Sequence, residues 1–141
     1  MPKNLSYEQA ATLPEAYATS YLNLFWEGHL NKENTAFIPA GASGLASVAI
    51  PMAKAFGARV ITSVLSDEIA KKIAPLGADV VINSANQDVS EFLNQEELNG
   101  TPVNMSMDCL CVTQWDGSIV LTKLTYDGII IAGDYYAKTS T

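Results

Sequence analysis

The chain has 141 residues and a mass of 15.1 kDa, and 48% of its residues are hydrophobic, which suits about one domain with a buried core. Eight lysines and arginines against fifteen aspartates and glutamates give a net charge of −7, the wrong sign for a surface that binds nucleic acid. No apolar run reaches the ~18 residues of a membrane span, and the first residues lack the apolar core of a secretory signal. We therefore expect a cytoplasmic protein with no membrane or nucleic-acid partner.

Histidine and cysteine are scarce in this chain. His29 is the only histidine, and Cys109 and Cys111 are the only cysteines, too few and too scattered for a four-ligand zinc site. We interpret the cysteines as buried thiols and expect no bound zinc. His29 lies in a predicted helix-ending turn, far in sequence from any nucleophile, which disfavours hydrolases that use a histidine base.

The first part of the chain is predicted to be helical. Residues 7–26 carry apolar side chains at spacings of three and four, and Pro14 is placed to begin a second helix. A polar linker completes an N-terminal segment, residues 1–34, ahead of a second unit at residues 35–141. That unit begins with an apolar strand, Thr35–Pro39.

A long amphipathic helix follows this strand and ends at Gly57. Pro51 removes one hydrogen bond from its interior and predicts a kink near Ser47. We place its buried face on Leu45, Val48, Ala49, Met52, Ala53 and Phe56.

The remaining sequence alternates between apolar strands and helices. We expect strands at Arg59–Leu65, Asp79–Asn83, Val103–Cys109 and Gly128–Ala132, and helices at Asp67–Pro75, Val89–Leu98 and Val112–Leu124. Strands that are apolar throughout and separated by helices predict an α/β fold, a doubly wound parallel sheet covered on both faces.

The loop between the first strand and the amphipathic helix carries the strongest functional signal. Its first glycine permits a tight turn, its small side chains let N–H groups approach a pyrophosphate, and the helix N-terminus supplies positive potential. The alternative is a plain connection that uses small residues for packing. The loop departs from the G-x-G-x-x-G fingerprint at its third and sixth positions, and its residues are Gly41, Ala42, Ser43, Gly44, Leu45 and Ala46.

Several segments together resemble the medium-chain dehydrogenase/reductase superfamily, and within it the zinc-independent quinone oxidoreductase-like branch. They are Ser6–Pro14, Ala18–Tyr21, Ile38–Lys54, Leu76–Asp79 and Met107–Cys109, and they span nearly the whole chain. The resemblance implies a Rossmann domain of strand order 3-2-1-4-5 that binds a nicotinamide dinucleotide, in an enzyme that reduces quinones, enones or related carbonyl compounds. Members of the superfamily are much longer and commonly homodimeric. The resemblance therefore also implies that this chain is a fragment without the substrate domain. It would lack the sixth strand too, which would leave an unpaired edge on the sheet.

The resemblance further implies roles for individual residues. The backbone of Gly41–Ala46 would face the pyrophosphate, and Thr19 would lie on the nicotinamide side, although a threonine inside a helix is an equally good interpretation. Asp108 is either a base or, more commonly, a cap residue. The ends of the fourth and fifth strands would form cofactor walls with Cys109, Leu110, Ala132 and Gly133.

The end of the second strand favours NADP over NAD. It offers Ser63 and Ser66 but none of the carboxylates that bind the ribose 2′-hydroxyl of NAD, so a 2′-phosphate meets no repulsion. The usual lysine position of the superfamily holds Ile69, so Lys71 or Lys72 would supply the cation, unless both are merely solvated. At position 84, where NADP-binding relatives often have tyrosine, the chain has serine.

No catalytic residue stands out in the sequence. Tyr135–Lys138 lacks the spacing of a Tyr-x-x-x-Lys pair and comes too late in the chain, so we interpret it as a surface tail. Besides an oxidoreductase, a non-catalytic nucleotide-sensing or interaction module remains open, with a reading frame that begins near Met1 and ends near Thr141. A methyltransferase is disfavoured because no acidic residue directly follows the second strand.

Overall fold

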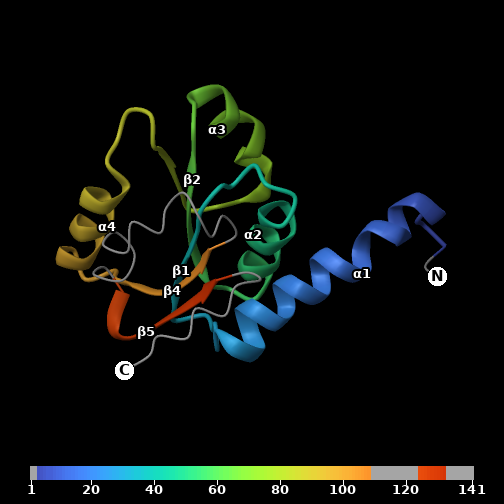
Figure 1. Cartoon of the computed structure of the whole chain (residues 1–141), viewed down its shortest axis with the longest axis horizontal. Coiled ribbons are helices and arrows are strands. Elements are labelled where there is room, and N and C mark those ends of the chain that lie inside the picture. Colours follow the sequence, from blue (N-terminus) through green and yellow to red (C-terminus); the bar gives the residue numbers. More distant parts are fainter. Residues whose placement is uncertain (1–2, 109–123, 133–141) are drawn as a thin grey trace.

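The fold is built on a parallel sheet of five strands in the order β3-β2-β1-β4-β5 (Figure 1). The computed structural model describes residues 3–108 and 124–132. The strands are β1 Thr35–Ile38, β2 Arg59–Val64, β3 Val80–Asn83, β4 Val103–Asp108 and β5 Leu124–Ala132. All four neighbouring pairs are parallel, so the predicted fold class and strand order are confirmed.

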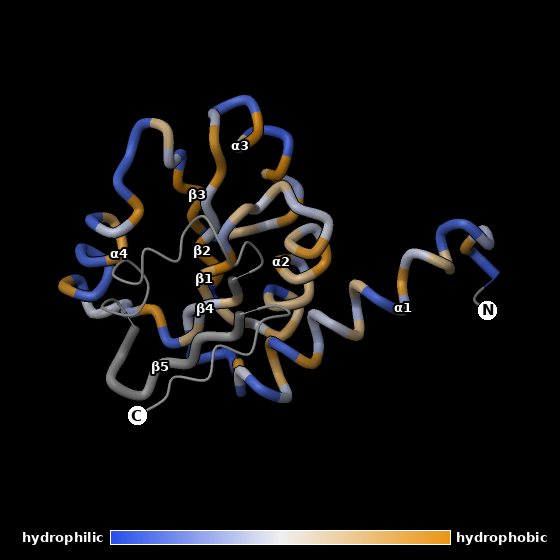
Figure 2. The backbone as a smooth tube through the Cα atoms, in the orientation of Figure 1, coloured by the Kyte–Doolittle hydropathy of each residue, from blue (hydrophilic) through white to orange (hydrophobic). Residues whose placement is uncertain are grey.

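Helices cover both faces of this sheet, and each face has its own apolar core. On one face, α2 (Ala46–Ala55) packs over residues of β1, β2 and β4 such as Ile38, Val60 and Met105. On the other face, Leu93 of α4 (Val89–Leu98) packs on residues such as Phe37 and Ile61. Neighbouring residues of β1 thus face opposite cores, as the two-residue period of a strand requires. The tube in Figure 2 shows hydrophobic strands at the centre and hydrophilic segments on the outer sides of α3 and α4.

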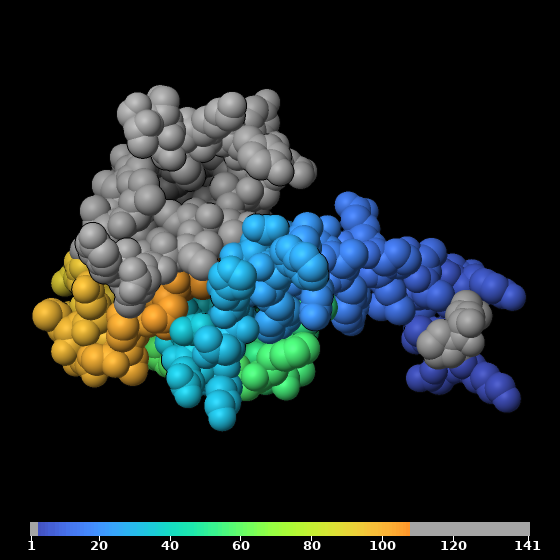
Figure 3. Space-filling view, turned by 90° about the horizontal axis from the view of Figure 1, so that it is seen from below, coloured from blue at the N-terminus to red at the C-terminus, as the bar shows by residue number. Residues whose placement is uncertain are grey.

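The N-terminal helix α1 (Tyr7–Tyr21) projects away from the layers (Figures 1 and 3). It begins with a capping box, in which Ser6 Oγ accepts the Gln9 N–H and Gln9 Oε1 accepts the Ser6 N–H. It continues as a wider π-type turn, η1 (Leu22–Glu27), up to Gly28. The expectation that Pro14 begins a second helix is wrong, because α1 runs through this exposed residue without a break.

The buried face of α2 also differs from the prediction. Its fully buried side chains are Ala46, Ala49, Ile50 and Ala53, whereas Phe56 is 55% exposed. Leu45, Val48 and Met52 are only half-buried. Three of the four buried residues are alanines, so α2 packs closely on its neighbours because its buried side chains are small. The helix runs through Pro51, and the kink expected near Ser47 stays a prediction.

The later elements follow the predicted order with shifted ends. Helix α3 occupies Asp67–Ile73 and continues as a short 3-10 turn, η2 (Ala74–Leu76), before Gly77. Strand β5 is longer than expected, because it begins at Leu124. The helix expected over Val112–Leu124 otherwise lies outside the described residues, and the division into segments 1–34 and 35–141 stays a prediction.

Candidate functional site

The loop after β1 is anchored to the end of β2. Gly41 N–H donates to the Ser63 carbonyl at 2.9 Å, and the buried Thr62 hydroxyl donates to the Ile38 carbonyl at 2.6 Å. A Cβ on Gly41 would come closest to Thr62 Oγ1 and would lie 2.8 Å from Ile73 Cδ1. Gly41 is therefore required by the close approach of the loop to two side chains.

This finding changes the role expected for Gly41. The sequence analysis assigned it to a tight turn, but the residue with positive φ is its neighbour Ala40, at 52°. Gly41 is not among the glycines with positive φ. The glycine supplies space, while the turn is made one residue earlier.

Ser43 caps the start of the helix that follows. Its hydroxyl oxygen accepts the Ala46 N–H at 3.1 Å, and its carbonyl accepts the Ser47 N–H at 3.0 Å. A serine oxygen that accepts an N–H three residues on is the usual N-cap arrangement. The serine that replaces a fingerprint glycine thus has a local structural function.

Three backbone N–H groups of the loop have no hydrogen-bond partner among the described residues. Those of Ala42, Gly44 and Leu45 donate to no acceptor within residues 3–108 and 124–132. Ala42 and Gly44 are exposed, and a Cβ on Gly44 would meet no atom of residues 3–108 or 124–132 within 4 Å. Unpaired donors beside the first turn of α2 suit an anion, since the helix dipole adds positive potential there.

The position of the loop in the sheet supports the same interpretation. Strand β1 is central, with β2 and β3 on one side and β4 and β5 on the other. The loop therefore lies at the carboxyl end of the strand where the order reverses. In open α/β sheets, ligands bind in the crevice at such a switch point.

The end of β2 is a polar region with mixed charge. Ser66 caps α3 by accepting the Ile69 N–H at 3.3 Å, and Asp67 in the first turn accepts Asn83 Nδ2 at 2.7 Å. Ser63 is buried, and its carbonyl accepts the Gly41 N–H of the loop after β1.

Two lysines of α3 differ in their partners. Lys72 pairs with Glu68 at 2.7 Å. Lys71 is exposed and has no ion-pair partner within the described part of the chain. Of the two cations considered for a 2′-phosphate, Lys71 is therefore the uncommitted one.

The structure describes only some of the other predicted site residues. Thr19 is half-buried on α1, and its carbonyl accepts the Leu22 N–H. Ala132 ends β5 opposite Asp108, so the ends of the two strands lie side by side. The predictions for Cys109, Leu110 and Gly133 fall outside the described residues, as does that for Tyr135–Lys138.

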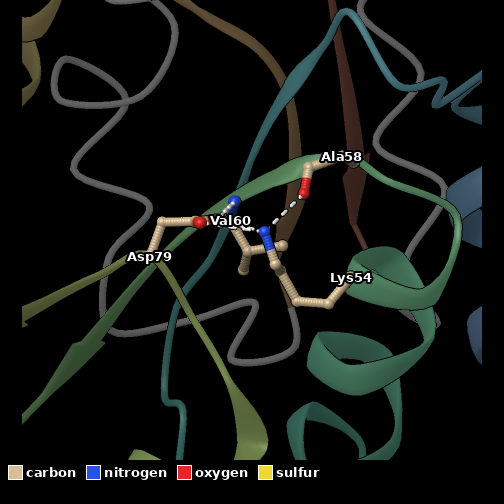
Figure 4. A network of polar contacts seen from close by, with 4 residues as sticks. All are labelled: Lys54, Ala58, Val60 and Asp79. Carbon is tan, nitrogen blue, oxygen red and sulfur yellow. Dashed lines mark hydrogen bonds and ion pairs between the residues drawn. The ribbon is translucent and has the colours of Figure 1, made fainter.

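A polar clamp of Lys54, Ala58, Val60 and Asp79 lies where β2 and β3 begin, at the end of the sheet away from the loop. Figure 4 shows these four residues. Lys54 Nζ donates to both carboxylate oxygens of Asp79, each at 2.8 Å, and to the Ala58 carbonyl at 3.0 Å. Asp79 also accepts the Val60 N–H at 2.7 Å. The clamp joins the last turn of α2 to the starts of β2 and β3.

The charge of this clamp is stabilised in the folded state. Burial alone raises the pKa of the Asp79 carboxyl, but the hydrogen bonds from Lys54 and Val60 and the positive charges of Lys54 and Arg59 together outweigh it, so its pKa lies below the ordinary value. Sequence reasoning missed the interaction because the two side chains are 25 residues apart in the chain.

A family model described as zinc-binding dehydrogenase matches residues 44–130. The chain belongs to this family. The resemblance to the medium-chain dehydrogenase/reductase superfamily and its quinone oxidoreductase-like branch is also confirmed.

Relatives of this dehydrogenase family chain include two curated proteins. It is 36% identical over 105 residues to a zinc-type alcohol dehydrogenase-like protein of Staphylococcus epidermidis, covering 70% of this chain and 31% of that protein. It is 31% identical over 136 residues to the NAD(P)H oxidoreductase RTN4IP1, mitochondrial, of Danio rerio, covering 88% and 34%. The chain thus spans about a third of the length of these relatives.

A solved structure supports the fold. The quinone oxidoreductase of Escherichia coli complexed with NADPH superposes with a TM-score of 0.81 at 28% identity, covering 94% of this chain and 40% of that one.

The described residues hold no group of three histidine, cysteine, aspartate or glutamate side chains that could bind a metal. None of the described helices has the length and hydropathy to cross a bilayer.

Proposed function

We propose that this dehydrogenase family chain is the NADPH-binding part of an oxidoreductase that transfers hydride to a quinone, enone or related carbonyl compound. The observation that carries the proposal is the set of N–H groups on Ala42, Gly44 and Leu45, at the switch point of the sheet, that have no acceptor in the part of the chain that the structure describes. They would bind the pyrophosphate. The open space beside Gly44 leaves room for it.

The dinucleotide would supply the redox chemistry when bound, and this chain would supply binding and orientation. Its loop donors and the dipole of α2 would hold the negative charge of the pyrophosphate, which matters in a chain of net charge −7. Lys71 would neutralise a 2′-phosphate. The Escherichia coli relative is a quinone oxidoreductase with NADPH, which supports this choice of cofactor and substrate class.

The substrate side would lie with those parts of the longer relatives that the match to this chain does not cover. Catalytic turnover, homodimer formation and a cytoplasmic location are therefore expectations for a whole enzyme of this kind. Residues 1–141 on their own should bind the cofactor weakly and turn over little or no quinone.

Calorimetric titration of the folded chain with NADPH and with NADH tests the proposal. We expect both to bind, and NADPH more tightly. Absence of heat with either cofactor at millimolar concentration, in protein shown to be folded by circular dichroism, would contradict it. The coding sequence that flanks residues 1–141 separates this proposal from a non-catalytic module, because only the module predicts a reading frame that begins near Met1 and ends near Thr141.

A further inference from the structure

We infer that Thr62 is a positioning residue for the loop that would bind the pyrophosphate, an inference that rests on the proposed function. Thr62 is on β2, outside the loop, and its side chain is completely buried. It has no route to a ligand of its own. Its influence on binding must therefore act through the residues that it contacts.

The first of these contacts fixes the end of β1. The Thr62 hydroxyl donates to the Ile38 carbonyl at 2.6 Å, and Ile38 is the last residue of the strand before the loop. Ile38 is fully buried, so water cannot replace this donor. Loss of the hydroxyl would remove this donor from a buried carbonyl three residues before Gly41.

The second contact, between Thr62 and Gly41, determines how closely the loop approaches β2. A Cβ on Gly41 would clash with Thr62 Oγ1 and would lie 3.1 Å from Thr62 Cγ2. The Gly41 N–H in turn donates to the carbonyl of the next residue of β2, Ser63, at 2.9 Å. The loop thus rests on the threonine side chain and is tied to the strand beside it.

These two contacts determine where the free donors lie. Ala42 follows Gly41 directly, and Gly44 and Leu45 follow two and three residues later, so a shift of Gly41 is carried to all three N–H groups. Donors to a pyrophosphate must converge on the same oxygens, and displacements near 1 Å weaken such arrays strongly. The hydroxyl of Thr62 is therefore expected to raise cofactor affinity without touching the cofactor.

The test compares variants that differ in the hydroxyl. Thr62→Val keeps the shape and removes the hydroxyl, whereas Thr62→Ser keeps the hydroxyl and removes the methyl group. We expect the dissociation constant for NADPH, measured by calorimetry, to rise about tenfold in Thr62→Val and to stay within about twofold in Thr62→Ser. Should Thr62→Val fail to fold, Thr62→Ala against Thr62→Ser makes the same comparison, because these two differ by the hydroxyl only.

Ser106 provides a matched control. It is a fully buried residue of β4, and its hydroxyl has no partner within the described residues. Ser106→Ala should leave the affinity for NADPH unchanged. A loss equal to that of Thr62→Val would show a general effect of core substitutions and would overturn the inference.

A spectroscopic readout separates positioning from stability. In the wild-type chain, NADPH should shift the amide resonances of Ala42, Gly44 and Leu45, and Thr62→Val should change these shifts while Ser106→Ala should not. Equal affinity of Thr62→Val and wild type, or equal losses in Thr62→Val and Thr62→Ser, would refute the role of the hydroxyl. Absence of NADPH binding by the wild-type chain would refute the proposed function instead, so the two failures are distinguishable.

Discussion

The two glycines of the loop provide a sharp test because their surroundings are opposite. A Cβ on Gly41 would clash with Thr62 and lie 2.8 Å from Ile73 Cδ1, whereas a Cβ on Gly44 would meet no described residue within 4 Å. Gly44 also has no positive φ that a side chain would strain. The same substitution, glycine to alanine, should therefore have different effects at the two positions.

The expected magnitudes follow from this geometry. Gly41→Ala overpacks a buried contact and should lower the free energy of unfolding by about 2 kcal/mol. For a domain of this size, that lowers Tm by about 8 °C. Gly44→Ala should change stability by less than about 1 kcal/mol and can raise it, because alanine restricts the unfolded chain.

Gly44→Ala should weaken cofactor binding although it leaves stability nearly unchanged. Its added methyl group would project into the open space beside the free N–H groups and obstruct the pyrophosphate. We expect Gly44→Ala to bind NADPH about tenfold more weakly with an unchanged Tm. Gln95→Ala, at an exposed position on α4, serves as the control for both measurements.

Thermal unfolding followed by circular dichroism and calorimetric titration with NADPH supply the two numbers. Gly44→Ala with wild-type affinity would refute the placement of the ligand at this loop. Gly41→Ala with wild-type Tm would refute the packing of the loop on β2.

The remaining predictions concern charged side chains. Because the folded pKa of Asp79 is lowered, its contribution to stability is present above the ordinary value of 3.8 and is lost as pH falls through the lower folded value. Asp79→Asn should therefore lower the free energy of unfolding by about 1 kcal/mol at neutral pH, a value discounted because the Asp79 side chain is 36% exposed. The variant should also lose less stability than wild type on acidification, which urea titrations at several pH values would show. Lys71→Ala should weaken NADPH binding several-fold with no effect on NADH, whereas Lys72→Ala, whose lysine already pairs with Glu68, should alter neither; equal effects of the two variants would contradict the assignment.

The fold was predictable because its signals are local. Apolar strands, separated by helices with their own caps and glycine ends, specify a parallel sheet without knowledge of distant contacts. The errors came where size matters more than hydropathy. The face of α2 was placed one residue off because its buried side chains are mostly alanines, and Pro14 was given a helix start although its ring faces solvent inside α1.

The position of the candidate site could be proposed from the sequence, but the contacts that hold its loop in place could not. A loop of small residues after the first strand is visible in any sequence of this kind. The reason for Gly41 is not, because it depends on Thr62 and Ile73, which are far along the chain. The clamp of Lys54 and Asp79 was missed for the same reason, since no local pattern links a lysine in one helix to an aspartate before a later strand.

Ser43 offers a last prediction, because it occupies a position where the fingerprint has glycine. Its hydroxyl accepts the Ala46 N–H at 3.1 Å, and this removes a donor that the loop could otherwise offer to an anion. Ser43→Gly would release that N–H while costing only a few tenths of a kcal/mol as an N-cap change. We expect Ser43→Gly to bind NADPH about threefold more tightly, with Tm lowered by about 1 °C.

The opposite result is equally informative about the loop. If Ser43→Gly bound NADPH more weakly at similar Tm, the serine hydroxyl itself would contact the pyrophosphate, and the cap seen here would be exchanged for a ligand contact on binding. Ser43→Ala separates these cases, because it frees the same N–H without the flexibility of glycine. Tighter binding by both variants requires that the cap competes with the ligand for one donor, and weaker binding by both requires that the hydroxyl is part of the site.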